Sequence, residues 1–288
     1  MSTTNALLEA VCAPENISLA WSRFARCRGI WAPGLPMGQV AKSPVLPVLM
    51  LAEEMRRGRY RPQPAHRVPV RKADGGLREL HIYMIRDRVA QRALLQVLQP
   101  QTDPHMSPMS FGFRPGRSVA QAVHAVQREL DAGLCWVGDA DVEKCFDRMV
   151  HRHALHAVED AAGGAAAGLL RRWMGWPAQV GAETRGLAQG SVLAPWVCNL
   201  YLAPLDARIQ AAGLGWVRYA DDFVLLAPTR RMAEEGLSLC AQALGALGLA
   251  LHPVKTAVRH AALPFRFLGQ WLAATPLLPA PCACPQGS

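Results

Sequence analysis

The sequence predicts an α+β fold, built as one large domain or as two lobes. Segments with the periodicity of a helix alternate with short apolar runs of strand length, and two pairs of these runs are joined by turn residues typical of hairpins. Hydrophobic residues make up 51% of the 288 residues and charged residues 18%, which excludes a disordered chain and provides ample core.

The N-terminal part is expected to contain a helix, a loop and a hairpin. Residues 16–28 are amphipathic with helical spacing, and the Gly- and Pro-rich residues 29–47 predict a loop. We therefore treat residues 1–47 as a helical extension with a loop. Residues 68–82 contain two apolar segments around Asp74-Gly75, a dipeptide that favours a tight turn, and so predict a β-hairpin.

The middle of the chain predicts two helices and a strand. Apolar residues recur with helical spacing over residues 86–99. Ser118 is followed three residues later by Gln121, which predicts a capping box at the start of a second helix. A strand is expected over residues 136–141.

The C-terminal part predicts a hairpin over residues 216–227, where two apolar segments are separated by turn residues. Two helices and two short strand regions are expected around it, over residues 191–212, 231–247, 249–259 and 265–272. Residues 275–288 contain four prolines, and we expect them to form an irregular tail.

The positive charge of the chain is concentrated in one segment. The sequence has 31 Lys and Arg residues against 22 Asp and Glu, a formal net charge of +9. Residues 56–92 contain eleven of the basic residues and three acidic ones, a local excess of eight positive charges. Such a basic stripe fits the binding of phosphate backbones, and the alternative is a solvated charged surface.

Cysteine usage and hydropathy predict a protein of a reducing compartment. The eight cysteines are scattered, and only Cys282 and Cys284 lie close together, which is weak for a zinc site. We therefore expect reduced, mostly buried thiols. No apolar run approaches the roughly 18 residues that span a bilayer, and the N-terminus has no signal-peptide core, so we expect a cytoplasmic protein without a membrane partner.

Three carboxylates carry the chemistry that the sequence predicts. Asp221 and Asp222 lie between apolar runs at the tip of the expected 216–227 hairpin, and Asp141 ends a strand 80 residues upstream. Carboxylates that converge on divalent cations are what two-metal phosphoryl transfer requires. Asp139 would point to the same face of its strand as Asp141, so spacing alone leaves both open as the first ligand.

From about Asn16 to Leu272 the chain resembles reverse transcriptases of the group II intron lineage, which include CRISPR-associated and other stand-alone bacterial enzymes. The resemblance is carried by Tyr-Ala-Asp-Asp at 219–222, Gln-Gly-Ser at 189–191 and Ser-Phe-Gly-Phe-Arg-Pro-Gly-Arg-Ser at 110–118, in the family's order. It implies the fingers and palm of a right-hand polymerase over residues 48–274, with an antiparallel palm sheet. The thumb or maturase region is expected to be absent or vestigial.

The resemblance implies an active site with two Mg²⁺ ions, which Mn²⁺ can replace. The family's first aspartate stands five residues before an aromatic residue, which selects Asp141 over Asp139. Asp141, Asp221 and Asp222 are then the catalytic and metal-binding residues, with Asp221 as the direct ligand from the turn. Phe146 matches the aromatic residue that excludes a ribose 2′-hydroxyl.

The resemblance also implies residues that bind nucleotide and nucleic acid. Lys72 and Arg78 flank the tip of the expected hairpin and match the residues that clamp the incoming triphosphate. Gln189 and Gly190 match the nucleotide and template pocket, and Lys255 matches a lysine near the leaving pyrophosphate that can act as a general acid. The implied contacts with the strands are Arg86, Arg88, Arg114, Arg117 and the primer-grip residues Phe267, Leu268 and Gly269.

Two places depart from the family pattern. His81 and Tyr83 stand where the family has the Gly and Pro of Leu-Gly-Ile-Pro, so template contacts are not carried over to them. Ala194 replaces the usual Ser that follows the Gln-Gly pair.

These residues predict an RNA-directed DNA polymerase that extends a DNA or RNA primer with dNTPs on an RNA template. The short region after Gly269 favours a stand-alone enzyme, in spacer acquisition beside a CRISPR integrase or in defence, with another protein supplying the thumb function. The alternatives are a catalytically weak nucleic-acid-binding scaffold and a truncated remnant of an intron-encoded protein.

Overall fold

The fold is described from a computed structural model, in which residues 3–71, 75–176 and 184–274 are described. Four strands form the central sheet, in the order β6–β7–β5–β8, and every pairing in it is antiparallel. These strands are β5 (Trp136–Asp141), β6 (Gly215–Tyr219), β7 (Asp222–Ala227) and β8 (Ala257–His260). The predicted α+β fold with an antiparallel palm sheet is confirmed.

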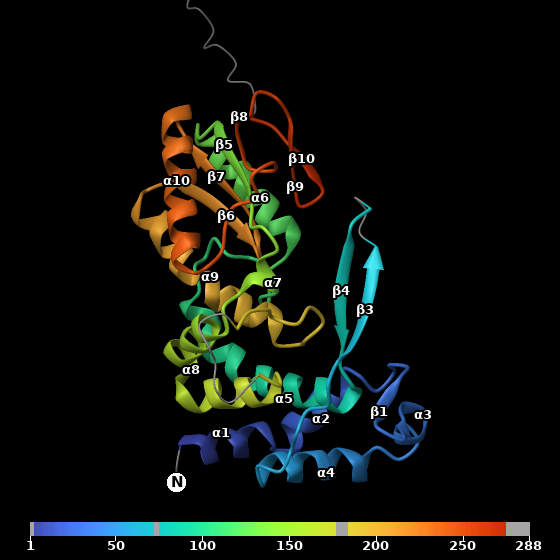
Figure 1. The fold of residues 1–288 in the computed structure, drawn as a ribbon. Helices are drawn as coiled ribbons and strands as arrows, with labels where there is room; N and C mark the ends of the chain where they lie inside the picture. Colours follow the sequence, from blue (N-terminus) through green and yellow to red (C-terminus); the bar gives the residue numbers. More distant parts are fainter. Residues whose placement is uncertain (1–2, 72–74, 177–183, 275–288) are drawn as a thin grey trace, which may run out of the picture.

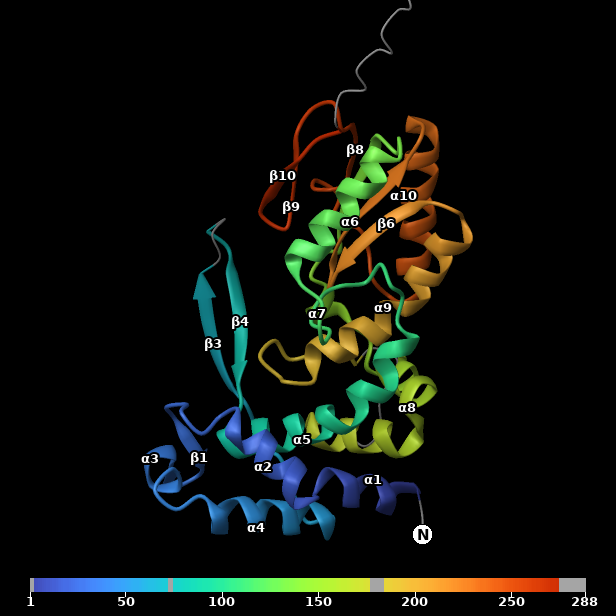
Figure 2. The ribbon, with the colours of Figure 1, turned by 180° about the vertical axis from the view of Figure 1, so that it is seen from behind.

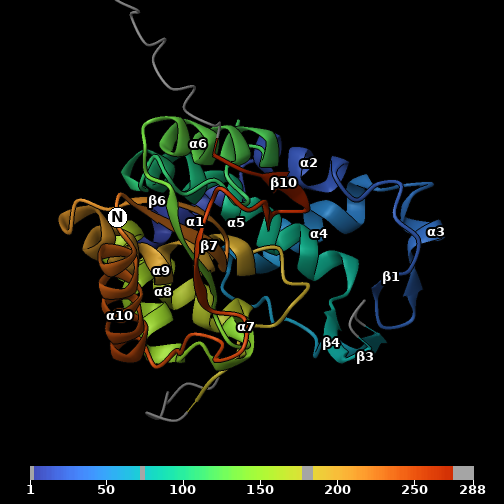
Figure 3. The ribbon, with the colours of Figure 1, turned by 90° about the horizontal axis from the view of Figure 1, so that it is seen from above.

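Two helices cover opposite faces of this sheet (Figure 3). On one face, α6 (Val119–Asp131) packs Ala122 and Val126 into a cluster with Val137 and Val224 of the sheet. On the other, α10 (Arg230–Ala246) packs Leu237 so close to Gly138 that an added Cβ would lie 3.1 Å from the leucine Cγ. Because neighbouring strand residues point to opposite faces, the continuous apolar run of β7 supplies both cores, with Phe223 and Leu225 in one and Val224 and Leu226 in the other.

A layer of helices lies at the other end of the molecule (Figures 1 and 2). Its centre is α5 (Ile85–Thr102), which packs against four other helices. These are α1 (Thr3–Val11), α2 (Pro14–Ser22), α4 (Val45–Arg56) and α8 (His151–Trp173). The largely buried helix α9 (Ala194–Ala211) contacts α8, α10 and β6, and so joins this layer to the sheet.

The strands β3 (His66–Arg71) and β4 (Leu77–Ile82) form the fingers hairpin, which pairs within itself and projects beside the sheet (Figure 1). Five of the six residues of β3 are exposed. A second hairpin near the C-terminus is formed by β9 (Phe265–Phe267) and β10 (Gln270–Leu272). The remaining elements are β1 (Ile30–Ala32), β2 (Leu35–Pro36), α3 (Met37–Val40), the 3₁₀ helix Asp103–His105 and α7 (Cys145–Arg148).

The structure differs from the sequence-based expectations mainly in the N-terminal part and in α8. The helix expected over residues 16–28 ends at Ser22, and the expected loop over residues 29–47 contains β1, β2, α3 and the start of α4. No helix was specified for α8, whose sequence is rich in Ala and Gly and whose backbone leaves helical geometry at Gly163 (φ 84°). The capping box of Ser118 and Gln121 is confirmed at the start of α6.

The cysteine prediction holds for the part of the chain that the structure describes. Its six cysteines are all free thiols, and four of them are buried. Cys282 and Cys284 lie outside the described residues. Among the helices of the described ranges, none combines the length and the apolar character needed to cross a bilayer.

Candidate active site

The turn between β6 and β7, residues 219–222, is called the catalytic turn because it carries Asp221 and Asp222. Ala220 lies in the left-handed region (φ 60°), which is unfavourable for a residue with a Cβ. Such strain persists only where surrounding structure determines the conformation. The contacts that hold this turn are therefore part of the site.

Arg218 of β6 is a buried cation beneath the catalytic turn, with a side chain that is only 1% exposed. It forms a bidentate ion pair with Asp206 of α9, with Nε–Oδ1 and Nη2–Oδ2 distances of 2.7 and 2.5 Å. Its Nη1 donates to Ala220 O (2.9 Å) and to Asn199 Oδ1 (3.0 Å). Because a buried charge is stable only with such partners, the guanidinium fixes the carbonyl of the turn residue.

Residues 107–118, called the support loop, pack against the same turn. Two backbone hydrogen bonds of 2.8 and 2.9 Å join this loop to Arg218. A Cβ added to Gly112 would lie 2.4 Å from Ala220 N, a distance that real Cβ atoms do not show. Asn199 Nδ2 donates to Gly112 O (2.7 Å) and holds this close approach. Only glycine fits here without displacing the turn.

The first aspartate, Asp141, ends β5 and pairs in register with Asp222 of β7. Its backbone oxygen accepts a hydrogen bond from His252 N (2.7 Å), and its Oδ2 accepts one from Lys255 Nζ (2.7 Å). Asp139, the alternative that spacing left open, pairs instead with Arg259 (3.1 Å) and lies outside the cleft that Asp141 lines. The geometry therefore favours Asp141 as the first carboxylate of the site.

Asp222 is surrounded by other carboxylates, which affect its ionisation. Partial burial of its carboxyl group, followed by repulsion from Asp221, Asp141 and Asp139, raises its pKa to about 6, and Lys255 opposes this shift. Like charges that share a site resist ionisation together. A bound cation would relieve this repulsion.

The donor set is that of a divalent-cation site, although the carboxylates are not gathered around one point. Within the described ranges, no three Asp, Glu, His or Cys side chains are arranged so that they could hold an ion. Asp141 instead faces the Lys255 ammonium, a cation in contact with the carboxylate that would serve as a ligand. Carboxylate oxygens are the ligands that Mg²⁺ prefers, so the residue types fit the predicted ions.

The three aspartates line one cleft of about 710 Å³. Four further residues that the sequence analysis assigned to the site line it with them, namely Phe146, Gln189, Gly190 and Lys255. The cleft is also lined by Phe113, Asp147 and His252, which the sequence analysis did not assign to it. Ala194, one of the departures from the family pattern, is buried in its wall.

The base of the fingers hairpin is joined to the Gln189-Gly190 segment. His81 N donates to Gln189 O (2.7 Å), and a Cβ on Gly190 would lie 2.4 Å from His81 O. The side chain of Gln189 donates to Asp147 Oδ1 (3.3 Å) across the cleft wall. Thus the backbone of His81 makes the contact with this segment. Tyr83, the other residue of the hairpin that departs from the family pattern, is buried.

The two cations assigned to the tip of the hairpin are only partly covered by the structure. Lys72 lies outside the described residues. The backbone of Arg78 pairs with Val70 in the hairpin ladder, as expected of a residue near its tip. Their contact with a triphosphate stays a prediction.

The arginines assigned to the nucleic-acid strands do not line the cleft. Arg86 pairs with Glu54 (2.6 Å) and also lies over the Tyr60 ring. Arg88 lies over the Phe24 ring, with 4.7 Å between Cζ and the ring centroid. These contacts tie α5 to the N-terminal helices.

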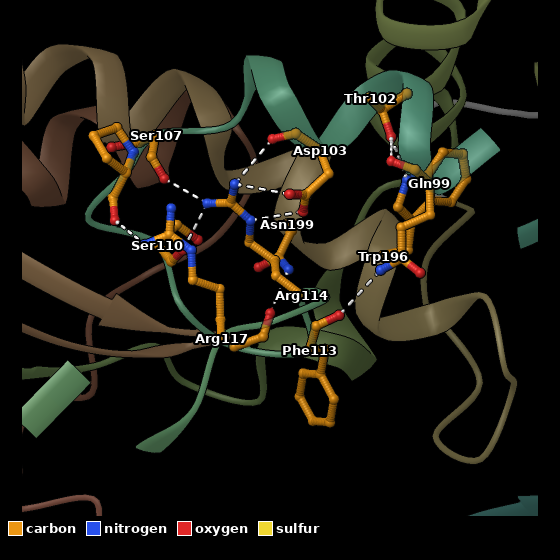
Figure 4. A network of polar contacts seen from close by, with 12 residues as sticks. Gln99, Thr102, Asp103, Ser107, Ser110, Phe113, Arg114, Arg117, Trp196 and Asn199 are labelled. Atoms are coloured by element: carbon orange, nitrogen blue, oxygen red, sulfur yellow. Dashed lines mark hydrogen bonds and ion pairs between the residues drawn. The ribbon is translucent and has the colours of Figure 1, made fainter. Parts of the chain in front are cut away.

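Arg114 corrects the sequence-based expectation most clearly (Figure 4). Its side chain is 3% exposed and ion-pairs with Asp103 at 2.8 Å. Further hydrogen bonds run to the backbone oxygens of Asp103, Ser107 and Ser110. Arg114 is thus an internal support of the loop and not a surface contact, whereas Arg117 is partly exposed over the Phe111 ring.

The primer-grip residues form the turn between β9 and β10. Leu268 (φ 48°) and Gly269 (φ 82°) both have left-handed backbones, which makes the tight turn, and Phe267 is buried in the cluster beneath α6. They lie outside the cleft residues. Their assigned contact with a primer stays a prediction.

Sequence reasoning missed the supports of the catalytic turn and the exposed ring of Phe113. A signal for the supports was present, because Arg218 is a charge inside an apolar strand, and such a residue is usually paired when buried. No pattern distinguished Phe113 from the neighbouring Phe111, which is buried.

Known proteins resemble the chain in both sequence and fold. The reverse transcriptase (RNA-dependent DNA polymerase) family matches residues 70–272. YkfC of Escherichia coli is 30% identical over 92% of this chain and 82% of its own length. The group II intron-encoded protein LtrA of Lactococcus lactis is 29% identical over 54% of this chain, which corresponds to 27% of LtrA.

A solved structure supports the fold independently. The telomerase of Candida albicans matches 83% of this chain and 49% of its own chain with a TM-score of 0.59 at 12% identity. This likeness shows the fingers-and-palm fold alone. Taken with the family match over most of the chain, it leads to one conclusion: the chain belongs to the reverse transcriptase family, and its domain is of the group II intron type.

Proposed function

We propose that this chain is an active RNA-directed DNA polymerase that extends a primer with dNTPs on an RNA template. One observation carries the proposal: Asp141, Asp221 and Asp222 face one cleft that also contains Phe146, Gln189 and Lys255. A protein that only bound nucleic acid as a scaffold would not need catalytic carboxylates and nucleotide-pocket residues together in one cleft. The family membership supports the same reaction.

The aspartates would hold the predicted Mg²⁺ ions, with Asp221 and Asp141 as direct ligands and Asp222 adding charge. Bound there, the ions would lower the pKa of the primer 3′-hydroxyl and stabilise the departing pyrophosphate. The protein contributes fixed positions, because the β5–β7 register sets Asp141 beside Asp222 and Arg218 holds the turn. Lys255, whose Nζ donates to Asp141 Oδ2, would then meet the negative charge of the leaving group.

Substrate selection is assigned to the cleft wall. Phe146 is partly exposed on it, where an aromatic ring below the sugar would exclude a 2′-hydroxyl. Gln189 and Gly190 line the same proposed nucleotide pocket, with the backbone of Gly190 against His81. The natural template, the priming mode and a CRISPR or defence setting stay predictions that the neighbouring genes would test.

Primer extension tests the proposal. Purified protein is incubated with a DNA-primed RNA template, dNTPs and Mg²⁺, beside the double variant Asp221→Ala/Asp222→Ala. A matched control is Glu234→Ala/Glu235→Ala, which removes two adjacent exposed carboxylates on α10 that do not line the cleft. We expect extension by the wild type and by the control, and none by the aspartate variant.

The same samples separate polymerase from scaffold. If neither the wild type nor the aspartate variant extends the primer while both bind it in a fluorescence anisotropy assay, the scaffold becomes the better explanation. Extension by the aspartate variant would refute the assignment of the metal site.

A further inference from the structure

Phe113 is one of two strongly exposed aromatic residues in the described ranges. Its side chain is 55% exposed, and the only other aromatic residue there with a comparably exposed hydrophobic side chain is Trp271 on β10. Figure 4 shows the Phe113 ring pointing away from the polar network of the support loop. A single exposed apolar side chain is ordinary on a protein surface, so the backbone and the surroundings of Phe113 must decide whether its ring has a role.

The backbone of Phe113 is held in a costly conformation. Its φ of 58° is unfavourable for a bulky residue, for which glycine or asparagine would be the ordinary choice. Gln99 Nε2 donates to Phe113 O (3.2 Å), and the neighbouring Gly112 is fixed by Asn199 and by its contact with Ala220. On its other side Arg114 anchors the loop to Asp103. The loop thus fixes the backbone from which the ring projects.

That position is in the active-site cleft. Phe113 lines the cleft together with the three aspartates, and its ring centroid lies 6.1 Å from that of Tyr219 at an angle of 49°. Tyr219, the last residue of β6, is also the first residue of the catalytic turn. The Phe113 ring therefore lies in the cleft with the aspartates and close to the residue that begins the catalytic turn.

We propose that Phe113 is a nucleic-acid-binding residue whose ring packs against the terminal base pair of the primer–template duplex. The inference rests on the proposed polymerase function, since it takes the cleft to hold that base pair. An exposed aromatic ring suits this role because every base offers an apolar face, whatever the sequence. In this proposal Phe113 contacts the nucleic acid, and the adjacent residue Arg114, to which the sequence analysis assigned such a contact, supports the loop.

Photocrosslinking tests the contact directly. The probe is a DNA primer with 5-iodo-2′-deoxyuridine at its 3′ end, annealed to RNA and irradiated in complex with the full chain. Mass spectrometry should find the adduct on Phe113. An adduct confined to residues outside the support loop and the catalytic turn would overturn the proposal.

Binding measurements test the energetic role. The dissociation constant of the same primer–template, without iodine, is measured by fluorescence anisotropy for Phe113→Ala, Phe113→Trp and the control Leu46→Ala. Leu46 is a 66% exposed apolar residue on α4. We expect Phe113→Ala to bind about tenfold more weakly, Phe113→Trp to bind like the wild type, and Leu46→Ala to be unchanged.

Two further readouts exclude a merely structural role. Phe113→Ala should leave the melting temperature unchanged, because the ring is exposed, and should leave the salt dependence of binding unchanged, because no phosphate contact is lost. Unchanged affinity of Phe113→Ala, or weaker binding that parallels a lower melting temperature, would overturn the proposal. The wild-type extension assay keeps the two hypotheses apart: an adduct on Phe113 without extension would refute the polymerase function, and extension with unaltered binding by Phe113→Ala would refute the contact.

Discussion

The catalytic turn and the fingers hairpin each connect two antiparallel strands, but the molecule holds them in opposite ways. β6 and β7 lie inside the four-stranded sheet, and the arginine beneath their turn is almost completely buried. β3 and β4 pair only with each other, and β3 is exposed along nearly its whole length. Among the described residues, a backbone hydrogen bond from His81 to Gln189 joins the base of the hairpin to the cleft.

This difference fits the two tasks that we assign to these regions. Carboxylates that act on reacting atoms must be held within a fraction of an ångström, which requires support from packed neighbours. A hairpin that approaches a triphosphate with cations needs no such core. Substitutions near the turn should therefore be costly, whereas substitutions on the hairpin strands should be tolerated.

The largest effect is expected from Asp141→Asn, which removes the carboxylate at the centre of the site. The rate of primer extension should fall by about 10³-fold, because charge stabilisation by metal ions contributes several kcal/mol. The free energy of unfolding should change by less than about 1 kcal/mol, since the ion pair that is lost is partly exposed. Single-turnover extension and urea denaturation measure the two quantities. A variant that keeps its activity would contradict the assignment.

Arg218→Met should mainly reduce stability. Removal of the cation leaves Asp206 buried without its partner, which typically costs about 3–5 kcal/mol. The double variant Arg218→Met/Asp206→Leu leaves no buried charge in this pair and should recover much of the loss in a denaturation experiment. Its extension rate should stay low, because the hydrogen bond to Ala220 O is missing. Recovery of both stability and rate would show that this bond does not position the turn.

Gly112→Ala should disturb the turn through a single methyl group. The added Cβ would lie 2.4 Å from Ala220 N, so the catalytic turn or the support loop must shift. We expect a loss of about 10²-fold in extension rate, as is typical of small displacements of reacting groups. Gly168→Ala on α8 is the matched control, because its Cβ meets no atom within 4 Å, and it should be neutral or slightly stabilising. Equal rates for both variants would argue against the support role of Gly112.

The smallest effect is expected on the fingers hairpin. Glu79→Ala removes an exposed carboxylate that lies 3.5 Å from Arg67 and 3.5 Å from His81, and such surface pairs contribute little. The free energy of unfolding should fall by less than about 0.5 kcal/mol in urea denaturation. A loss as large as that of Arg218→Met would remove the contrast between the two regions.

Local sequence patterns predicted the elements whose signals are themselves local. Ser118 and Gln121 form the expected capping box, and the two strands of the expected N-terminal hairpin, β3 and β4, pair with each other. Helix α8 escaped prediction because Ala and Gly give little apolar periodicity, and α4 because it follows a Pro-rich stretch. Alanine has the highest helix propensity, so the composition of α8 favoured a helix although its periodicity did not reveal one.

The residues of the candidate site that belong to family motifs could be predicted from the sequence. Asp141, Asp221, Asp222, Phe146 and Gln189 meet in one cleft, as their motifs imply. The direction in which a loop side chain points cannot be read from a motif, so Arg114 was assigned to the surface although its charge is paired inside. For the same reason the exposed ring of Phe113 went unnoticed.

Mapping of the metal site by iron-mediated cleavage tests the central claim most directly. Fe²⁺ replaces Mg²⁺ in the protein–primer–template complex, and ascorbate with peroxide then generates radicals that cut the backbone next to the bound ion. We predict cuts near residues 141 and 220–222, which excess Mg²⁺ suppresses and Asp141→Asn abolishes. Cuts elsewhere in the chain, or cuts at these places that persist in Asp141→Asn, would contradict a metal site built from these aspartates.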